Sequence, residues 1–536
     1  MARALLIVLC ALLALPVLAV LASWLTFDGA ALDILRHQAS TVLPGYAGQS
    51  LLLALGVGLG VALLGGATAA AVSLFQFPGR RFFEWALLLP LAMPAYVLAY
   101  AYTDFLQYGG ALQRAIRAAT GAEGALWPDV RSLPGAVVLF VLCLYPYVYL
   151  LTRAALGERA VQLMEAARLL GARAGRRVRE IALPLARPAL AAGVALALME
   201  TLADYGVGAY FGLTTFSTGI YQAWLVMGDR IAAAQLASLL LLVVALLLWL
   251  ERHAQAKARF AASRLGAAHA ADARLLPLRG RAAAGAVLLC ALPVLLGFVL
   301  PVGVLLALLW GEAVHGEVGL PLTRFARWSW TSLQLAAGAA ALAAALALAL
   351  GAALRRRRGG LLTLAARTVS LGYAVPGAVI AVGILLPMGA VQARWPQAPV
   401  TALFTGTVLG LLTAYLVRFS AVALQSVEAG YARLPTSIDD TARMLGAGRA
   451  RVLRELHLPL LKRSLLAAAL LVFVDVMKEL PATLVLRPFD SDTLAVVAYN
   501  LARDERLAEA ALPSLAIVLV GLVPVLLLSR ALRARG

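Results

Sequence analysis

The sequence predicts an all-α polytopic membrane protein with about twelve transmembrane helices, arranged as two parallel six-helix repeats. The 536-residue chain is 62% hydrophobic and only 14% charged, whereas soluble proteins average roughly 45–50% apolar and about 25% charged residues. Its apolar residues come in uninterrupted runs of about 20, the length of a helix that crosses a bilayer. A basic polar segment also occurs twice, at residues 165–190 and 440–465.

Twelve apolar runs are candidate spans, and they are too long for barrel strands, which alternate over about ten residues. The first run follows Arg3 and resembles a signal peptide. It is long for one and more spans follow it, so we expect an uncleaved first helix. In chain order the runs are 4–26, 49–75, 84–106, 131–152, 186–209, 231–250, 282–310, 330–354, 366–389, 399–417, 464–486 and 508–529.

The positive charges predict the orientation of these helices. With the N-terminus in the cytoplasm, the inner loops contain 32 Lys and Arg residues and the outer loops contain 10. Cytoplasmic loops of membrane proteins are enriched in these residues, so we expect both termini on the cytoplasmic side. The net charge of +19 then reflects the topology, and we expect no nucleic-acid partner.

The repeat divides the chain into three predicted regions. Residues 1–250 form a first half of six helices, residues 251–281 a cytoplasmic linker, and residues 282–536 a second half of six helices. Both copies of the segment run in the same direction and precede the fifth span of their half. An even number of spans per half preserves orientation, so we expect parallel halves related by an axis along the membrane normal.

The repeated segment reads as two short helices that meet at a glycine. The first copy contains EAARLLG from Glu165 to Gly171 and, nine residues later, IALP from Ile181 to Pro184. Glycine permits a bend, and Pro184 ends the second helix or starts the next one. Apolar residues recur at intervals of three and four and predict a single apolar stripe. The stripe residues are Ala167, Leu170, Ala174, Val178 and Ile181.

A short amphipathic element of this kind has two physical interpretations. It inserts into a groove on another protein, or it lies in the lipid interface, held there by its arginines. The residues alone leave both interpretations open.

The motif Glu165-Ala166-Ala167, followed by Gly171, Ile181 and Pro184, resembles the EAA loop of bacterial ABC importer permeases. The second copy reads DTARMLG and LHLP, so it departs from the motif at three positions and keeps the rest. The departures are Asp440, Thr441 and Leu456, and the retained residues are Ala442, Gly446 and Pro459.

Further segments resemble the fused, two-half ferric iron permeases, and this resemblance covers essentially the whole chain. They are residues 89–100, 200–206 and 475–484. The resemblance implies a type I ABC importer permease in the bacterial inner (plasma) membrane. It also implies partners: two copies of an ABC ATPase subunit that grip the two loops, and a periplasmic substrate-binding protein.

The chain has no nucleotide site of its own. It contains no Gly-x-x-x-x-Gly-Lys-Ser/Thr motif, and its only lysines are Lys257, Lys462 and Lys478. We therefore expect a transport subunit that is not an enzyme and binds no cofactor, with ATP used by the partner subunit.

Ionisable residues inside predicted spans are candidates for a translocation path, because such residues are costly in a membrane. Glu200 and Asp204 lie four apart, as do Asp475 and Glu479 in the second half. Lys478 is placed to pair with Asp475 or with an acid from the other half. Hard oxygen ligands suit a hard cation such as ferric iron. The alternative is a set of ion pairs that orient the helices. The histidines and cysteines lack metal-ligand spacing, so no metal site is firmly predicted.

The predicted function is therefore that of the permease of an ATP-driven importer, carrying ferric iron inward by alternating access. Permeases for thiamine, polyamines or phosphonates remain alternatives, because the binding protein sets much of the cargo specificity. A secondary transporter driven by an ion gradient also fits twelve spans in parallel halves. Such a carrier has no use for a duplicated cytoplasmic loop, and for this reason we favour the importer.

Overall fold

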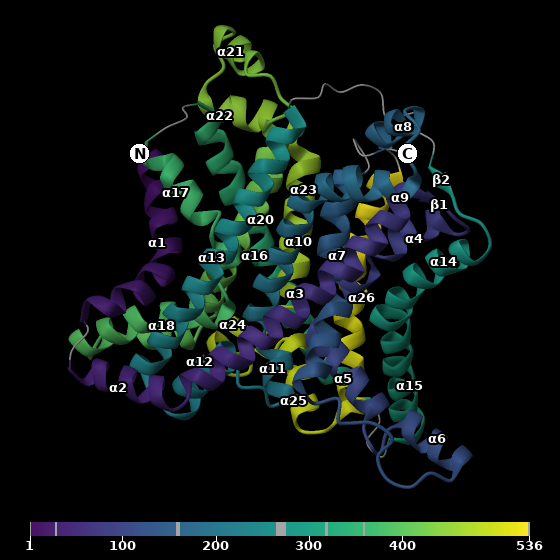
Figure 1. The fold of residues 1–536 in the computed structure, drawn as a ribbon. Coiled ribbons are helices and arrows are strands. Elements are labelled where there is room, and N and C mark those ends of the chain that lie inside the picture. Colours follow the sequence, from purple (N-terminus) through teal and green to yellow (C-terminus); the bar gives the residue numbers. More distant parts are fainter. Residues whose placement is uncertain are drawn as a thin grey trace. The chain divides into compact units, whose positions relative to one another are not determined.

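The computed structural model describes residues 2–26, 29–156, 161–263, 275–316, 320–356 and 360–533, and these are mostly helical (Figure 1). A pair of two-residue strands, β1 (Phe75–Gln76) and β2 (Leu276–Pro277), lies parallel. The chain divides into two compact units. Unit 1 is Met1–Ser40, Gly219–Leu241 and Pro321–Val497, and unit 2 is Thr41–Thr218, Leu242–Leu320 and Ala498–Gly536.

The described residues contain ten helices that are long and apolar enough to cross a membrane, or eleven if one bent pair counts as a span. Ten of the twelve predicted spans overlap one of these helices, but the helix begins only at Gly377 in the span expected at 366–389 and only at Val408 in the one expected at 399–417. The other two predicted spans are absent from the ten. The span expected at 84–106 is bent by 91° between Arg80–Ala92 and Ala95–Thr120, because Met93 is extended before Pro94. The span expected at 464–486 is interrupted where α23 (Leu458–Met477) ends.

Unit 2 is built around three mutually packed helices, α3 (Leu43–Leu74), α7 (Leu133–Ala155) and α10 (Leu183–Ala203). Small residues let these backbones approach closely, as is common where helices pack in membranes. A Cβ atom at Gly65 would lie 2.7 Å from the Tyr145 carbonyl oxygen. The remaining helices of the unit are α4 (Arg80–Ala86), α5 (Ala95–Leu106), α6 (Ala111–Thr120), α8 (Val161–Leu169), α9 (Ala174–Arg177), α11 (Gly206–Tyr210), α14 (Gly280–Val294), α15 (Leu300–His315) and α26 (Leu507–Arg533).

Unit 1 repeats this core with α16 (Leu322–Arg356), α20 (Val408–Tyr431) and α23. Around it lie α1 (Ala2–Ala22), α2 (Gly29–Ser40), α17 (Leu361–Val369), α18 (Gly377–Arg394), α19 (Val400–Thr405), α21 (Ser437–Met444), α22 (Arg449–Arg451) and α24 (Pro481–Leu486). Three further helices cross a unit boundary: α12 (Phe216–Tyr221), α13 (Arg230–Ser263) and α25 (Leu494–Arg503).

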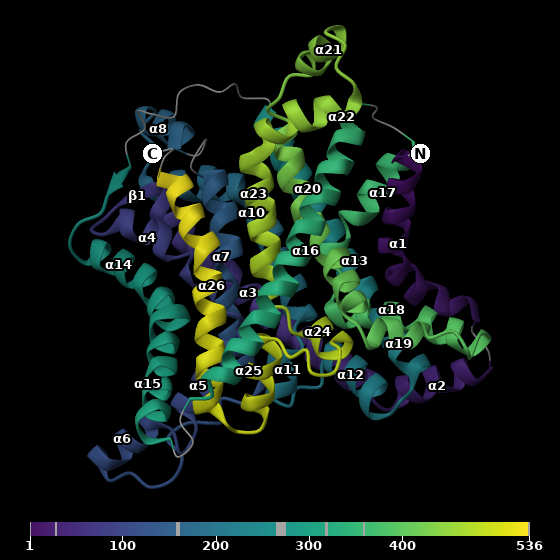
Figure 2. The ribbon, with the colours of Figure 1, turned by 180° about the vertical axis from the view of Figure 1, so that it is seen from behind.

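The units do not follow the predicted boundaries of the halves along the chain. The first helix, α1, packs along α17 and α18 in unit 1, while α15 packs along α5 and α26 in unit 2 (Figure 2). Part of the predicted linker is helical, because α13 continues to Ser263. Residues 264–274 lie outside the described residues.

The two halves also repeat their irregular backbone. Pro94 and Pro376 precede α5 and α18 with nearly identical dihedral angles, φ −61°, ψ 142° and φ −59°, ψ 142°. The two six-helix repeats predicted from one polar segment thus share their breaks as well as their helices.

Candidate functional site

The two copies of the repeated segment form the same structure. In the first, α8 ends at Leu169 and Gly171 adopts φ 83°; in the second, α21 ends at Met444 and Gly446 adopts φ 80°. The N–H of each glycine donates to a carbonyl three residues earlier, at 2.9 Å in both copies. The next N–H donates to a carbonyl five residues earlier, at 2.9 and 3.0 Å. This is the glycine-dependent Schellman ending of a helix, and it confirms the break predicted at the glycine.

After the break, each copy passes through a π-helical turn into a long helix. The turns are Val178–Ala182, which leads into α10, and Val452–His457, which leads into α23. Pro184 and Pro459 lie in the first turns of these helices and lack the N–H that a regular α-helix would use there. The prolines therefore start the following helix, which is one of the two positions expected for Pro184.

The tips of both loops expose a pair of large apolar side chains. Leu169 and Leu170 are 85% and 88% exposed, and Met444 and Leu445 are 89% and 82% exposed. These pairs occupy equivalent positions directly before the glycines. We call these two exposed pairs of equivalent apolar side chains the tip pairs.

The single apolar stripe predicted for the first loop is wrong. Val178 and Ile181 pack inward against the base of the loop, whereas Leu170 points outward. The left-handed glycine and the π-helical turn both change the helical register, so residues spaced by three and four do not stay on one face. Leu169 and Met444 were not among the predicted residues, because Leu169 lies outside the three-and-four spacing of the stripe and no stripe was predicted for the second loop.

The other predicted coupling residues lie in the helices before the glycines and in the π-helical turns after them. Glu165, Ala166 and Ala167 lie in α8, and Asp440 and Ala442 lie in α21. The Asp440 carboxylate is exposed and lies 3.4 Å from Arg443. Ile181 and its counterpart Leu456 are half-buried in the π-helical turns.

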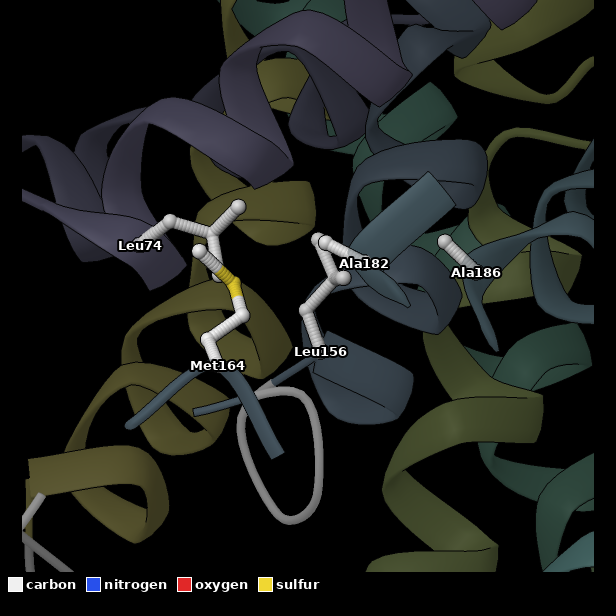
Figure 3. Packing of buried hydrophobic residues seen from close by; sticks show 5 residues of the cluster. All are labelled: Leu74, Leu156, Met164, Ala182 and Ala186. Atoms are coloured by element: carbon white, nitrogen blue, oxygen red, sulfur yellow. The ribbon is translucent and has the colours of Figure 1, made fainter. Parts of the chain in front are cut away.

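The base of the first loop is an apolar cluster (Figure 3). Its buried members come from α3, α7 and the loop itself, and they are Leu74, Leu156, Met164, Ala182 and Ala186. Arg177 supports the loop by donating from Nη1 to the Met164 carbonyl at 3.3 Å. The first of the two repeated loops is thus held mainly by apolar packing.

The base of the second loop is a buried polar network. Asp439 accepts from Arg355 Nε at 2.7 Å and lies 3.0 Å from His457 Nε2, and the Tyr431 hydroxyl lies 3.0 Å from His457 Nδ1. Arg355 also donates to the carbonyls of Tyr431, Leu434 and Pro435. Burial opposes ionisation of Asp439, but hydrogen bonds from Arg355 and His457 outweigh it and lower the pKa of that carboxyl. We did not anticipate this network, because no spacing relates residues so far apart.

Two of the predicted path acids cap short helices. Asp204 accepts from the Val207 N–H at 2.8 Å at the start of α11. Its counterpart Glu479 accepts from the N–H groups of Ala482 and Thr483 at 2.9 and 3.0 Å at the start of α24. Glu479 is also buried beside Arg418, 3.4 Å away. Both carboxylates satisfy backbone donors where a helix breaks.

The remaining path candidates lie nearby in their own units. Asp475 pairs with Lys478 at 3.0 Å, as their spacing predicts. Glu200 is half-buried in α10, four residues before Asp204. Among the described residues, no group of three or more His, Cys, Asp or Glu side chains is arranged to hold a metal ion.

Comparison with known proteins identifies two matching regions. The sequence matches the family described as binding-protein-dependent transport system inner membrane component over residues 62–260 and 345–535. It is 25% identical over 490 residues to the Fe(3+)-transport system permease protein FbpB 2 of Haemophilus influenzae, covering 90% of this chain and 89% of that protein. It is 29% identical over 266 residues to a Salmonella typhimurium protein named as a 2-aminoethylphosphonate transport system permease protein, PhnV, covering 48% of this chain and 97% of that protein.

Proposed function

Because this chain belongs to the family of binding-protein-dependent transport system inner membrane components, we propose that it is the permease subunit of an ATP-driven importer of ferric iron. The observation that carries the proposal is the duplicated loop, in which an exposed apolar pair precedes a left-handed glycine in each half. We place both loops and both termini on the cytoplasmic side, as the excess of Lys and Arg favours.

Each tip pair inserts into an apolar groove of one ATPase subunit, so one permease chain recruits two subunits. Apolar anchors in a groove are a common way for a short helix to bind a partner. The second half of each loop continues without a break into α10 or α23. Closure of the ATPase pair on ATP therefore moves a helix that crosses the membrane, and the path opens alternately to the two sides.

Ferric iron is the favoured cargo because of how the relatives cover the chain. The iron permease relative spans both halves, whereas the phosphonate permease relative spans about half of this chain. This chain and the iron permease relative thus both carry the two halves in a single chain. 2-Aminoethylphosphonate remains the second candidate, since its permease relatives are the other named group.

We assign Asp204 and Glu479 to positioning the broken helices that follow them, and keep Glu200, Asp475 and Lys478 as candidates for the path. The assignment rests on the backbone donors that the two capping carboxylates satisfy. If either carboxylate moved away, the backbone N–H groups that donate to it would lose their hydrogen-bond partner, which costs free energy. Neither acid is therefore free to move with a passing cation.

Uptake of radioactive iron tests the proposal directly. Cells that lack the protein should lose periplasm-dependent ferric uptake, and the wild-type gene should restore it. The same cells supplied with labelled 2-aminoethylphosphonate distinguish the second cargo. Purification of the chain with an ATPase in a 1:2 ratio supports the importer, whereas gradient-driven uptake without any ATPase would establish a secondary transporter.

A further inference from the structure

Unit 2 contains a group of tyrosines at its broken helices, which we call the phenol cluster. It consists of Tyr96 and Tyr100 on α5, Tyr205 and Tyr210 around α11, and Tyr499 on α25. The helix α11 packs against α5, and both lie at the end of unit 2 away from α8 (Figures 1 and 2). Discontinuous helices are where transporters commonly form binding sites.

The phenol cluster is inside the protein and is not a belt of membrane-interface anchors. Tyr96, Tyr100, Tyr210 and Tyr499 are all less than 9% exposed. The rings of Tyr100 and Tyr210 meet edge to face with centroids 4.8 Å apart. The hydroxyls of Tyr499 and Tyr205 lie 3.4 Å apart. Interface tyrosines instead direct their hydroxyls toward water.

The Tyr100 hydroxyl is buried without a hydrogen-bond partner. A buried polar group left in this state costs about 1–3 kcal/mol, and such groups in native structures call for an explanation. The rings of Tyr96 and Tyr210 both contact the Tyr100 ring, with centroids 5.8 and 4.8 Å away, and Asp204 directly precedes Tyr205 of the cluster in the chain. The unpartnered oxygen thus belongs to a cluster that carries further phenol oxygens.

The nearby cations are already paired with acids. Arg131 holds Glu505 through two contacts of 2.7 and 2.9 Å, and this hydrogen bonding lowers the pKa of Glu505. Arg503 lies 3.9 Å from Asp504. The charge balance next to the phenols therefore does not favour an anion, and Asp204 adds a negative charge.

The second half lacks this chemistry at the matching backbone positions. Ala378 and Val382 follow Pro376 as Tyr96 and Tyr100 follow Pro94, and Leu480 stands where Tyr205 precedes the short helix. The hydroxyls are therefore not needed for the fold of the broken helix itself.

We propose that the phenol cluster is a transient binding site for a hard, highly charged cation, with the Tyr100 oxygen as a ligand and Asp204 as a nearby countercharge. This inference rests on the proposed function, in which that cation is ferric iron. Oxygen ligands suit such ions. The phenol loses its proton to solvent when it coordinates the ion and regains one when the ion leaves, so no oxidant or reductant is needed.

Binding through the ring faces, as for an organic cation, is less favoured. The face of a ring attracts a cation only where it is open. The Tyr210 ring already holds the Arg131 guanidinium, 4.7 Å from its centroid, and the Tyr210 hydroxyl accepts from Arg131 at 3.1 Å. The unpartnered atom is the oxygen.

The test uses the full chain in lipid nanodiscs titrated with ferric citrate. We expect a visible phenolate-to-iron charge-transfer band in the wild type and its loss, at least tenfold, in Tyr100→Phe. Because the Tyr100 hydroxyl has no partner, this variant should melt at or above the wild-type temperature. Tyr145→Phe is the matched control: Tyr145 is equally buried but donates to the Leu87 carbonyl at 2.9 Å, so this variant should lose stability and keep the band.

Uptake in cells separates this inference from the proposed function. If wild-type cells import iron and Tyr100→Phe imports at the same rate with the same band, the phenol site is refuted while the importer stands. If wild-type cells import no iron, the proposed cargo fails. A tenfold loss of iron uptake in Tyr100→Phe, with normal ATPase association, supports the site.

Discussion

The bases of the two repeated loops have the same backbone and opposite chemistry. In the first, α8 rests on aliphatic and Met side chains; in the second, α21 rests on a buried acid, a histidine, a phenol and a guanidinium. Three positions correspond one to one between the copies: Leu156 with Tyr431, Met164 with Asp439, and Ala182 with His457. The same backbone is therefore compatible with an apolar cluster or with a polar network beneath the loop.

At the broken helices it is the first half, and not the second, that carries the polar side chains. There the first half carries the phenol cluster, and the second half carries aliphatic residues beside a Glu479 that Arg418 neutralises. A duplicated fold keeps its helix breaks, because backbone geometry requires them, while side chains at each end are free to diverge. The two halves therefore share a backbone and differ in the side-chain chemistry of both ends.

The largest effect is expected from breaking the polar base. Asp439→Met introduces the residue type of its first-half counterpart, Met164. The change leaves Arg355 and His457 buried without the carboxylate that they contact. Loss of one partner of a buried pair costs about 3–5 kcal/mol, so the melting temperature in detergent should fall clearly.

The matched control replaces the whole network with apolar residues, Arg355→Leu, Tyr431→Leu, Asp439→Met and His457→Ala. Apolar replacement of a complete buried network is often neutral or stabilising, so stability should largely return. If Asp439→Met alone melts like the wild type, the network does not hold α21.

A smaller loss of stability is expected from changing the two helix-capping acids, and it should be larger for Glu479 than for Asp204. Glu479→Gln removes a charge that binds two N–H groups and Arg418, and hydrogen bonds to charged groups contribute about 1.5–3 kcal/mol. Asp204→Asn keeps a cap at one N–H group and should cost only about 0.5 kcal/mol. Thermal melting of both variants gives the comparison, and equal losses would show that Arg418 contributes nothing.

The tip pairs should behave alike in both halves, unlike the bases. Leu170→Asp and Leu445→Asp place a charge in an apolar contact, so each should weaken ATPase association about tenfold, or about 1.4 kcal/mol, while leaving melting unchanged because both side chains are exposed. Pull-down with the partner ATPase measures the effect. A defect from only one of the two would mean that a single loop carries the coupling.

The smallest expected effect is a pH dependence confined to the second loop. The pKa of Asp439 is lowered from its ordinary value of 3.8, so its stabilisation is complete above about pH 4 and is lost as the pH falls through the lowered value. Hydrogen exchange of α21, corrected for intrinsic rates, should accelerate at low pH more than that of α8. Equal acceleration in both would contradict a role for Asp439.

Several features were predictable because they depend on neighbours in the chain. Gly171 predicted the break, and the structure has it in both copies. Pro184 was expected to end one helix or to start the next, and it starts one. The i,i+3 spacing of Asp475 and Lys478 gave one of the two partners expected for Lys478, and this is the pair that forms. The outward direction of Leu170 was not predictable, since a π-helical turn leaves no periodic signal. Nor was the partnership of Arg355 with Asp439, which are far apart in the sequence.

The sequence alone predicted a helical membrane protein with a loop that occurs twice, because run length and a repeated motif are local properties of the chain. The prediction of a permease rested on the resemblance of its motifs to a known family. Only the tertiary structure decided what lies beneath each loop and which tyrosines gather at the broken helices. These depend on which helices pack together, as when α1 joins α17 and α18, and packing is set by the fit of whole surfaces.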